Sequence, residues 1–554
     1  MMMLRPMAAK RPLLRKIVPF IRDESGVMAP QILFFFFLML LVGGVAVDLM
    51  RFESKRVALQ QTMDRATLAA ASLENSLVPL DVVNSYFDTA GLDAELGLVQ
   101  ILETQNGRTV RAQATVHSDN YFMSMMDVPY LEADNRSQAE QRINDIEIML
   151  VLDISGSMGS NHKIDNLKVA AKDFIDTVTA NDAEGRISIG IVPYNAQVNL
   201  GGPLRSKYNA TNVHGVANSN CLELPSSVFS SLALSRTLAI PMMADADVTS
   251  TTSKTNGFVS PTGSSATPAT GASYRWCTPS TKTDVTLPTK NKTALKAGID
   301  DLVADGNTSI LLGMRWASAL LDPAATSVYN ELIGAGQMDA SMSGRPYSYA
   351  SNDAMKVIVL MTDGEHVAHN RVVDAYKTGT SPIYKSTGDG NYSLYIDRPS
   401  TTSDYWVPHR ASGAGEWRTA PWNSGSGVQQ QTWQQVWKDL RVTYVAWQLY
   451  ARAIGGTNSS ARTTAYNDQM NIFLDPYASV GEMNTRLSNN CTAARAQGVL
   501  IYGIAFEAPA TGQAAISDCA SKPSSTYYFN ASGLDIQTAF QLIASNLSQL
   551  RLTQ

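Results

Sequence analysis

An uncharged apolar run near the N-terminus constrains this chain more than any other feature of its sequence. Residues 27–50 read VMAPQILFFFFLMLLVGGVAVDLM, and no charged side chain occurs from Ile32 to Val47. A helix of about 20 residues spans the ~30 Å hydrocarbon core of a bilayer. We therefore predict one transmembrane helix over residues 27–50. No small-residue cleavage site follows the run, and Asp48 and Arg51 come next, which favours an uncleaved anchor over a signal peptide.

The charges on either side of this run predict its orientation. Four basic residues follow the run within about 20 positions, whereas six precede it: Arg5, Lys10, Arg11, Arg15, Lys16 and Arg22. Cytoplasmic flanks of membrane helices carry the excess of Lys and Arg. Residues 1–26 are therefore expected in the cytoplasm, with a single pass through the inner (cell) membrane. The rest of the chain would be extracytoplasmic, which means periplasmic in a Gram-negative cell.

The cysteine content agrees with an oxidising compartment. The chain has four cysteines, and no C-x-x-C pair occurs, which argues against a zinc knuckle. Two disulfides with sequential pairing, Cys221–Cys277 and Cys491–Cys519, are the preferred interpretation. Four buried free thiols remain the alternative.

Length and charge limit the remaining choices. A chain of 554 residues is too long for one ordinary core and predicts two or more folded units. Its 44 basic and 49 acidic residues give a net charge of −5, and there is no long basic run. This balance predicts no nucleic-acid partner. Residues 51–142 are predicted to form a helix and a small α+β stalk, with strands at 98–103 and 109–117 joined by a turn at Gln105–Gly107.

From residue 143 onward, strand-like and helical patterns alternate. Strands are predicted at 146–152, 186–192, 356–361 and 499–506, and helices at 164–178, 292–303, 310–321, 483–497 and 534–550. Such alternation is typical of a mostly parallel sheet with helices on both faces. Residues 143–554 are therefore expected to form one α/β domain. Two long segments interrupt it, at about 203–289 and 367–482, and each is expected to carry local structure.

Oxygen-bearing side chains follow two of these strands and precede one helix. Asp153, Ser155 and Ser157 come directly after the first strand, Thr308 lies just before a helix, and Asp363 follows the strand at 356–361. Ligand crevices lie at the carboxyl ends of strands in open α/β sheets. Carboxylate and hydroxyl oxygens suit hard cations, Mg²⁺ first and also Mn²⁺ or Ca²⁺. We predict a metal site from these five residues; the alternative is that Asp, Ser and Thr merely cap helices.

Several stretches resemble known families. Phe20-Ile-Arg-Asp-Glu-Ser-Gly26, the apolar run, Ala46-Val-Asp48 and the Ala-rich helix after Gln60 are similar to the TadE/TadG-like proteins of the tight-adherence (Flp) pilus machinery. Some relatives are cleaved by a prepilin peptidase after a glycine that a glutamate follows five residues later. Here Gln31 occupies that place after Gly26, which argues against such cleavage and leaves processing open.

The residues Asp153-x-Ser155-x-Ser157, with Thr308 and Asp363, resemble the metal-ion-dependent adhesion site of von Willebrand factor A-like domains. This resemblance implies a Rossmann-like domain with a mostly parallel sheet flanked by helices. It also implies that an acidic residue of a partner protein completes the coordination of the metal. The C-terminal segment, from residue 498 to the end, and Val192-Pro-Tyr194-Asn195 resemble TadG-like proteins as well.

The function predicted from these patterns is non-enzymatic. The protein would be a membrane-anchored component of pilus assembly that binds other pilus-assembly or envelope proteins through the metal. A surface adhesin for host or matrix ligands is the alternative, and a hydrolase with its site in the insertions is a weaker one. The pair His366 and His369 is interpreted as an exposed loop pair rather than a metal site. The aromatic spacing from Trp433 to Trp447 is interpreted as a packing stripe.

Overall fold

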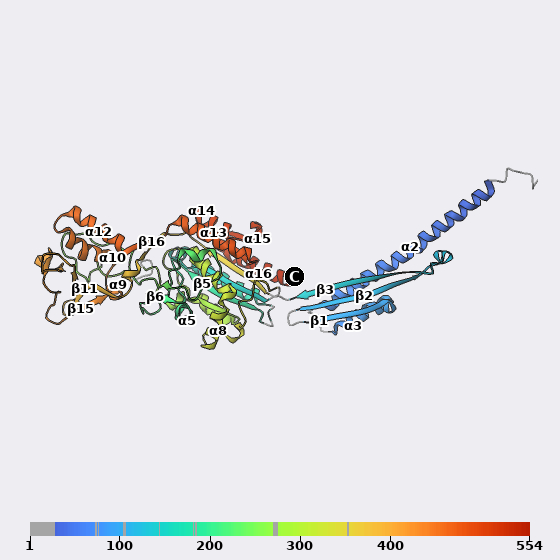
Figure 1. Cartoon of the computed structure of the whole chain (residues 1–554), viewed down its shortest axis with the longest axis horizontal. Coiled ribbons are helices and arrows are strands. Elements are labelled where there is room, and N and C mark those ends of the chain that lie inside the picture. The colour runs from blue at the N-terminus through green and yellow to red at the C-terminus, as the bar shows by residue number, and fades with distance from the viewer. Residues whose placement is uncertain are drawn as a thin grey trace, which may run out of the picture. The chain divides into compact units, whose positions relative to one another are not determined.

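The computed structural model describes residues 28–553 except 73–74, 76, 104–106, 143–144, 181, 183–184, 270–274 and 352–353. The chain divides into two compact units between residues 143 and 144. We call them the N-terminal and C-terminal units and describe each by itself (Figure 1).

The N-terminal unit begins with one continuous helix, α2 (Met28–Ala71). Among the described residues, it is the one helix long and apolar enough to cross a membrane, judged by length and composition. Its N-terminal half exposes large apolar side chains along its whole length, including four consecutive phenylalanines. Its C-terminal half buries Leu59, Met63 and Ala66 instead. The apolar run and the helix expected after it are therefore one element with two different environments.

The second half of α2 packs on a small antiparallel sheet. The sheet has the order β1-β2-β3. The elements of this layer are α3 (Pro79–Ala90), β1 (Leu96–Glu103), β2 (Gly107–Asp119) and β3 (Tyr130–Arg142). Alternate residues of β2, Val110 to Val116, form the core with α2 and α3. This is the small α+β module expected from the sequence; residues 104–106 of the predicted turn lie outside the described part.

A six-stranded sheet forms the centre of the C-terminal unit. Its strands are β4 (Asp145–Asp153), β5 (Ile187–Tyr194), β8 (Thr286–Thr289), β9 (Ala354–Thr362), β17 (Leu500–Phe506) and β18 (Tyr528–Ala531). Their spatial order is β18-β17-β9-β4-β5-β8. All neighbours are parallel except β8, which runs antiparallel to β5. Counted along the chain, this is the order 3-2-1-4-5-6 of a doubly wound fold, with the switch point between β4 and β9.

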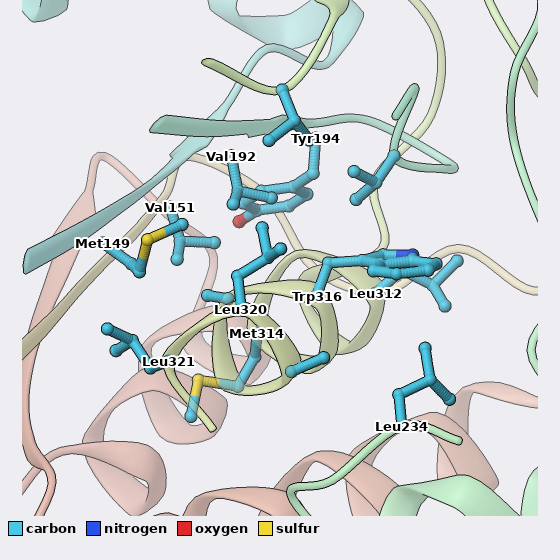
Figure 2. Packing of buried hydrophobic residues seen from close by; sticks show 14 of the residues in the cluster. Met149, Val151, Val192, Tyr194, Leu234, Leu312, Met314, Trp316, Leu320 and Leu321 are labelled. Atoms are coloured by element: carbon cyan, nitrogen blue, oxygen red, sulfur yellow. The ribbon is translucent and has the colours of Figure 1, made fainter. Parts of the chain in front are cut away.

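Helices cover both faces of this sheet. They are α4 (Lys163–Val178), α6 (Lys292–Asp301), α7 (Ile310–Leu321), α8 (Thr326–Gly334), α13 (Val480–Ala496), α14 (Ala510–Cys519) and α16 (Asp535–Thr553). Strand β4 is buried over its whole length. Met149 and Val151 face α7 in one core, as Figure 2 shows, whereas Ile148 and Leu150 belong to the core under α4 and α16. The predicted fold class, with its mostly parallel sheet buried on both faces, is confirmed.

The two insertions carry structure of their own. The first contains α5 (Gly201–Arg205), β6 (Ala210–Thr211) and β7 (Ile240–Pro241), and its chain is otherwise mostly irregular. The second contains a sheet of order β14-β13-β12-β11-β15. Strands β10 (His369–Val372) and β16 (Leu474–Ala478) of this insertion pair separately. The other elements of the second insertion include β11 (Thr380–Ser386), β12 (Tyr392–Tyr395), β13 (Tyr405–Val407), β14 (Glu416–Arg418), β15 (Val428–Thr432), α9 (Trp433–Asp439), α10 (Val442–Tyr444) and α12 (Ser459–Phe473).

The insertions share one hydrophobic core. Ala246 and Ala266 of the first insertion belong to the same buried cluster as the aromatic stripe of the second. Trp433 and Trp437 stack with ring centroids 5.1 Å apart. Trp447 donates from Nε1 to the carbonyl of Thr255 at 2.9 Å. The interpretation of the stripe as packing is confirmed, because its side chains are buried.

Both predicted disulfides are present. Cys221 is bonded to Cys277 within the first insertion, and Cys491 of α13 is bonded to Cys519 at the end of α14. The described residues include no free cysteine. The sequential pairing is therefore confirmed, and it fits an oxidising compartment.

Candidate metal centre

The first loop of the candidate site follows β4. Asp153 is the last residue of this strand and is fully buried. Its Oδ1 accepts a hydrogen bond from the amide of Ser155 at 2.8 Å, and its Oδ2 accepts one from the Thr362 hydroxyl at 2.6 Å. These two bonds fix the carboxyl group at the switch point between β4 and β9, because Thr362 ends β9.

The second loop, residues 305–308, is hydrogen-bonded to the first. The amide of Gly156 donates to the carbonyl of Gly306 at 2.8 Å, and the amide of Asp305 donates to the carbonyl of Ile154 at 2.7 Å. Gly306 has a φ of 79°, and a Cβ there would lie 2.8 Å from the side-chain nitrogen of Asn195. Glycine is therefore required at this position, both for the backbone conformation and for the close approach.

Thr308 connects the second loop to the third. Its carbonyl accepts from the amide of Val367 at 3.0 Å. A Cβ placed on Gly364 would lie 3.0 Å from the Thr308 hydroxyl oxygen. Thr308 is buried, and it lies beside the residue that follows Asp363. All three loops thus meet at the carboxyl end of the sheet.

Asp363, in the third loop, gathers the two serine hydroxyls. Its Oδ1 accepts from the Ser157 hydroxyl at 2.7 Å and from the Ser155 hydroxyl at 3.3 Å. The two hydroxyl oxygens are 3.1 Å apart. Ser155 also begins a short 3-10 helix without capping it through its side chain. Its hydroxyl therefore serves the cluster around Asp363, contrary to the capping alternative.

A lysine that the sequence reasoning did not select belongs to this cluster. The Nζ of Lys163, at the start of α4, lies 3.0 Å from Oδ2 of Asp363 and 3.6 Å from the carboxylate of Glu507. Lys163 is largely buried. Its positive charge partly compensates the carboxyl groups of Asp363 and Glu507. Thr362 and Asn195 were missed too; Thr362 directly precedes Asp363, and Asn195 directly follows β5, so their positions at strand ends were an available signal.

The two carboxyl groups of the site influence each other electrostatically. Burial and, second, the nearby charge of Asp363 raise the pKa of Asp153 to about 7, against the opposing effect of hydrogen bonds from Thr362 and Ser155. Burial, with the charge of Asp153, also raises the pKa of Tyr194. Tyr194 donates to the carbonyl of Met361 at 2.8 Å from within the core shown in Figure 2. A cation would stabilise both ionised carboxyl groups.

The donor set fits a hard divalent cation. It consists of two carboxylates and hydroxyl oxygens, which are the ligands that Mg²⁺, Mn²⁺ and Ca²⁺ prefer. In the described part of the chain, no three His, Cys, Asp or Glu side chains gather as a metal site. With only two carboxylates available, an ion would keep much of its positive charge, and it would attract a further acidic ligand.

A cleft opens beside the second loop. It has a volume of about 720 Å³ and reaches Asp305 on one side and the second insertion on the other. Basic side chains contribute to its wall: Arg275, Lys385 and Lys438. Arg275 is paired with Asp245 at 2.6 Å, and Lys385 is paired with Asp439 at 2.6 Å.

The two histidines after Asp363 correct one expectation. His366 and His369 are buried, whereas an exposed pair was expected. The Nε2 of His366 accepts from the amide of Leu311 at 2.9 Å, and its Nδ1 contacts the side-chain oxygen of Asn484 at 2.7 Å. The ring of His369 stacks on Tyr477 with centroids 4.8 Å apart. Burial lowers the pKa of both histidines to about 4, so both are neutral packing residues.

Residues 26–73 match the model of the TadE/G-like Flp pilus-assembly family. None of the curated proteins matches the chain. Among solved structures, the von Willebrand factor domain of the type V pili tip protein Mfa5 from Porphyromonas gingivalis is 12% identical and covers 74% of this chain and 97% of its own, with a TM-score of 0.29. The pilus adhesin RrgA from Streptococcus pneumoniae is 13% identical, with coverage of 81% and 48% and a TM-score of 0.28.

The pilus adhesin SpaC from Lactobacillus rhamnosus GG is 10% identical, and the match covers 82% of this chain but only 33% of SpaC, with a TM-score of 0.28. The chain thus spans about a third of the length of SpaC. Our fold assignment rests on the strand order of the sheet, and these likenesses add nothing to it. The family match and the apolar helix together indicate a membrane-anchored protein. Residues 26–73 are thus similar to the TadE/G-like Flp pilus-assembly proteins, and a doubly wound α/β domain follows this segment in the chain.

Proposed function

We propose that this protein is a membrane-anchored, metal-dependent protein-binding component of tight-adherence (Flp) pilus assembly. One observation carries the proposal. Oxygen atoms from Asp153, Ser155, Ser157 and Asp363 converge at the switch point of the sheet, and Thr308 lies beside them. The site would serve binding, in keeping with the match of residues 26–73 to pilus-assembly proteins.

The residues of this chain would have distinct roles at the site. Ser155, Ser157 and Thr308 would contribute hydroxyl oxygens, and Asp153 and Asp363 would contribute carboxylates directly or through water. The cation, Mg²⁺ before Mn²⁺ or Ca²⁺, would supply an electrophilic centre for an acidic side chain of the partner. Thr362 would hold Asp153 in place, since it donates to Oδ2 at 2.6 Å.

The surroundings of the site favour an acidic protein segment as the partner. The cleft beside Asp305 is wide enough for several side chains and has basic residues in its wall. Arg275 and Lys385 are paired with aspartates, so Lys438 would be the wall residue that attracts a carboxylate of the partner. The partner would be another pilus-assembly or envelope protein, reached from a domain that sits in the periplasm, with residues 1–26 in the cytoplasm and the anchor in the inner membrane.

A pull-down of the intact chain from solubilised membranes tests this function. Capture of partner proteins is expected in Mg²⁺ and is expected to disappear in chelator. Ser157→Ala should abolish the Mg²⁺-dependent part, because its hydroxyl contacts Asp363 at 2.7 Å. Ser160→Ala is the matched control, because Ser160 is an exposed serine three residues away whose side chain forms no hydrogen bond with Asp363 in the structure. Capture that is equal in Mg²⁺ and in chelator would contradict the proposal.

A further inference from the structure

The connection between β2 and β3 ends in an apolar tip. Residues 121–126 read Tyr-Phe-Met-Ser-Met-Met, and we call them the hairpin tip. Tyr121 is 66% exposed and Met125 is 84% exposed. Phe122 and Met126 are exposed to 37% and 41%. A hairpin connection in water is ordinarily built from polar residues and glycine, so this concentration of exposed apolar surface requires an explanation.

The hairpin tip is fixed to helix α2. Asp48 of this helix is 1% exposed and accepts hydrogen bonds from the amides of Tyr121, Phe122 and Met123 at 3.1, 2.7 and 2.8 Å. A Cβ on Gly44 would lie 2.4 Å from the ring of Phe122, so only glycine lets the ring approach the helix this closely. The exposed side chains of the tip are therefore held in position by defined contacts.

The position of the tip along α2 coincides with the end of the apolar run. Gly44 belongs to the uncharged stretch, and Asp48 is the first charged residue after that stretch. From Gly44 to Arg51 a helix rises by about 10 Å. Arg51 lies over the ring of Tyr121 at 4.1 Å. The tip thus occupies the level at which α2 would pass from hydrocarbon into headgroups. In Figure 1, β2 and β3 run along α2 with their connection directed toward its N-terminal half.

We propose that the hairpin tip is a second membrane contact, which inserts its apolar side chains into the outer headgroup region of the bilayer. Tyrosine prefers this region, and apolar side chains held there bury surface at the acyl boundary. Continuity with the apolar run favours lipid as the occupant, because Phe122 packs on a residue of that run. With two contacts, the stalk would be held at a fixed tilt instead of swivelling on one helix.

Fluorescence quenching in bilayers tests this inference. The full chain carrying Met125→Cys is labelled with an environment-sensitive dye and placed in phosphatidylcholine nanodiscs. Because the four native cysteines form disulfides, only the introduced thiol reacts. A nitroxide near the headgroup end of the lipid chains is expected to reduce the fluorescence severalfold. Aqueous iodide is expected to have little effect.

Leu102→Cys provides the matched control. Leu102 is 64% exposed and pairs with Thr109 of β2, ten residues from the tip end of that strand. Ten strand residues extend about 33 Å, which places this label well away from the bilayer. Iodide should quench it and lipid nitroxide should not. Met126→Cys repeats the measurement at a second tip position and is expected to behave like Met125→Cys.

Two outcomes would overturn the inference. If both tip labels respond to iodide as the Leu102 label does, the tip lies in water. If they are protected from iodide without being quenched by lipid nitroxide, a protein surface covers the tip. Neither outcome depends on the metal site, so this inference shares only the membrane anchor with the proposed function.

Discussion

One prediction concerns the buried carboxyl group of Asp153 and the stability of the metal-free protein. Replacing this buried carboxyl group by the isosteric amide, Asp153→Asn, should stabilise the metal-free protein at high pH. One pKa unit corresponds to about 1.4 kcal/mol. The rise of the Asp153 pKa from 3.8 to about 7 therefore makes its ionised form about 4 kcal/mol less favourable in the fold than in the unfolded chain.

The pH dependence follows from the direction of this pKa change. Because the folded pKa lies above the unfolded one, the unfolded chain binds fewer protons between about pH 4 and pH 7. The contribution of Asp153 to stability therefore falls as the pH rises through this window, and the asparagine variant escapes the loss. The asparagine can keep both hydrogen bonds of Asp153. Its side-chain oxygen can accept from the amide of Ser155, and its side-chain NH₂ group can donate to the Thr362 hydroxyl once that hydroxyl has rotated. The gain at pH 8 should approach, and not exceed, about 4 kcal/mol.

Tryptophan fluorescence of the full chain in detergent measures this effect. All eight tryptophans follow residue 144, so the signal reports the C-terminal unit alone. Unfolding by urea is compared at pH 4 and pH 8, in chelator and in Mg²⁺. Glu223 and Asp284, whose pKa values burial also raises to about 7, occur in both proteins and cancel in the difference. Mg²⁺ should stabilise the native protein and leave the variant unchanged.

The reasoning fails if Asp153→Asn is less stable than the native chain at pH 8 in chelator. Hydrogen bonds from Ser155 and Thr362 would then outweigh the desolvation of the carboxylate. It also fails if Mg²⁺ stabilises both proteins equally, because the cation would then bind elsewhere.

Two further predictions concern packing and cross-links. Replacing Cys491 and Cys519 by alanine should lower the free energy of unfolding by about 3–4 kcal/mol, since the bond closes a loop with a sequence separation of 28; urea unfolding with an unchanged midpoint would contradict this. Gly313→Ala should cost about 1–3 kcal/mol by overpacking, because the new Cβ would lie 2.5 Å from the ring of Tyr194; a thermal melt equal to that of the native chain would show that the ring can move aside.

Much of the fold follows from local patterns. The helix at 310–321 agrees with its predicted limits, and the strand at 354–362 extends the predicted one by two residues at its start and one at its end. Regular spacing of apolar residues along a segment determines such elements with little contribution from distant residues. The candidate site could also be predicted from the sequence, because Asp153 and Asp363 lie at the ends of parallel strands whose carboxyl ends share one edge of the sheet.

Other features required contacts between residues far apart in sequence. Lys163 joins the candidate site only because α4 brings its ammonium group to Asp363. The burial of His366 depends on Leu311 and Asn484, and no local pattern indicated either partner.

By itself, the sequence determined the apolar run, the alternation of strands and helices and the oxygen-rich loops, because each is written in neighbouring residues. Only the tertiary structure decided that both insertions share one core, and that Asp48 and Gly44 hold the hairpin tip. These contacts join segments about 75 and more residues apart, and their energies depend on packing and desolvation that appear only after the chain has folded.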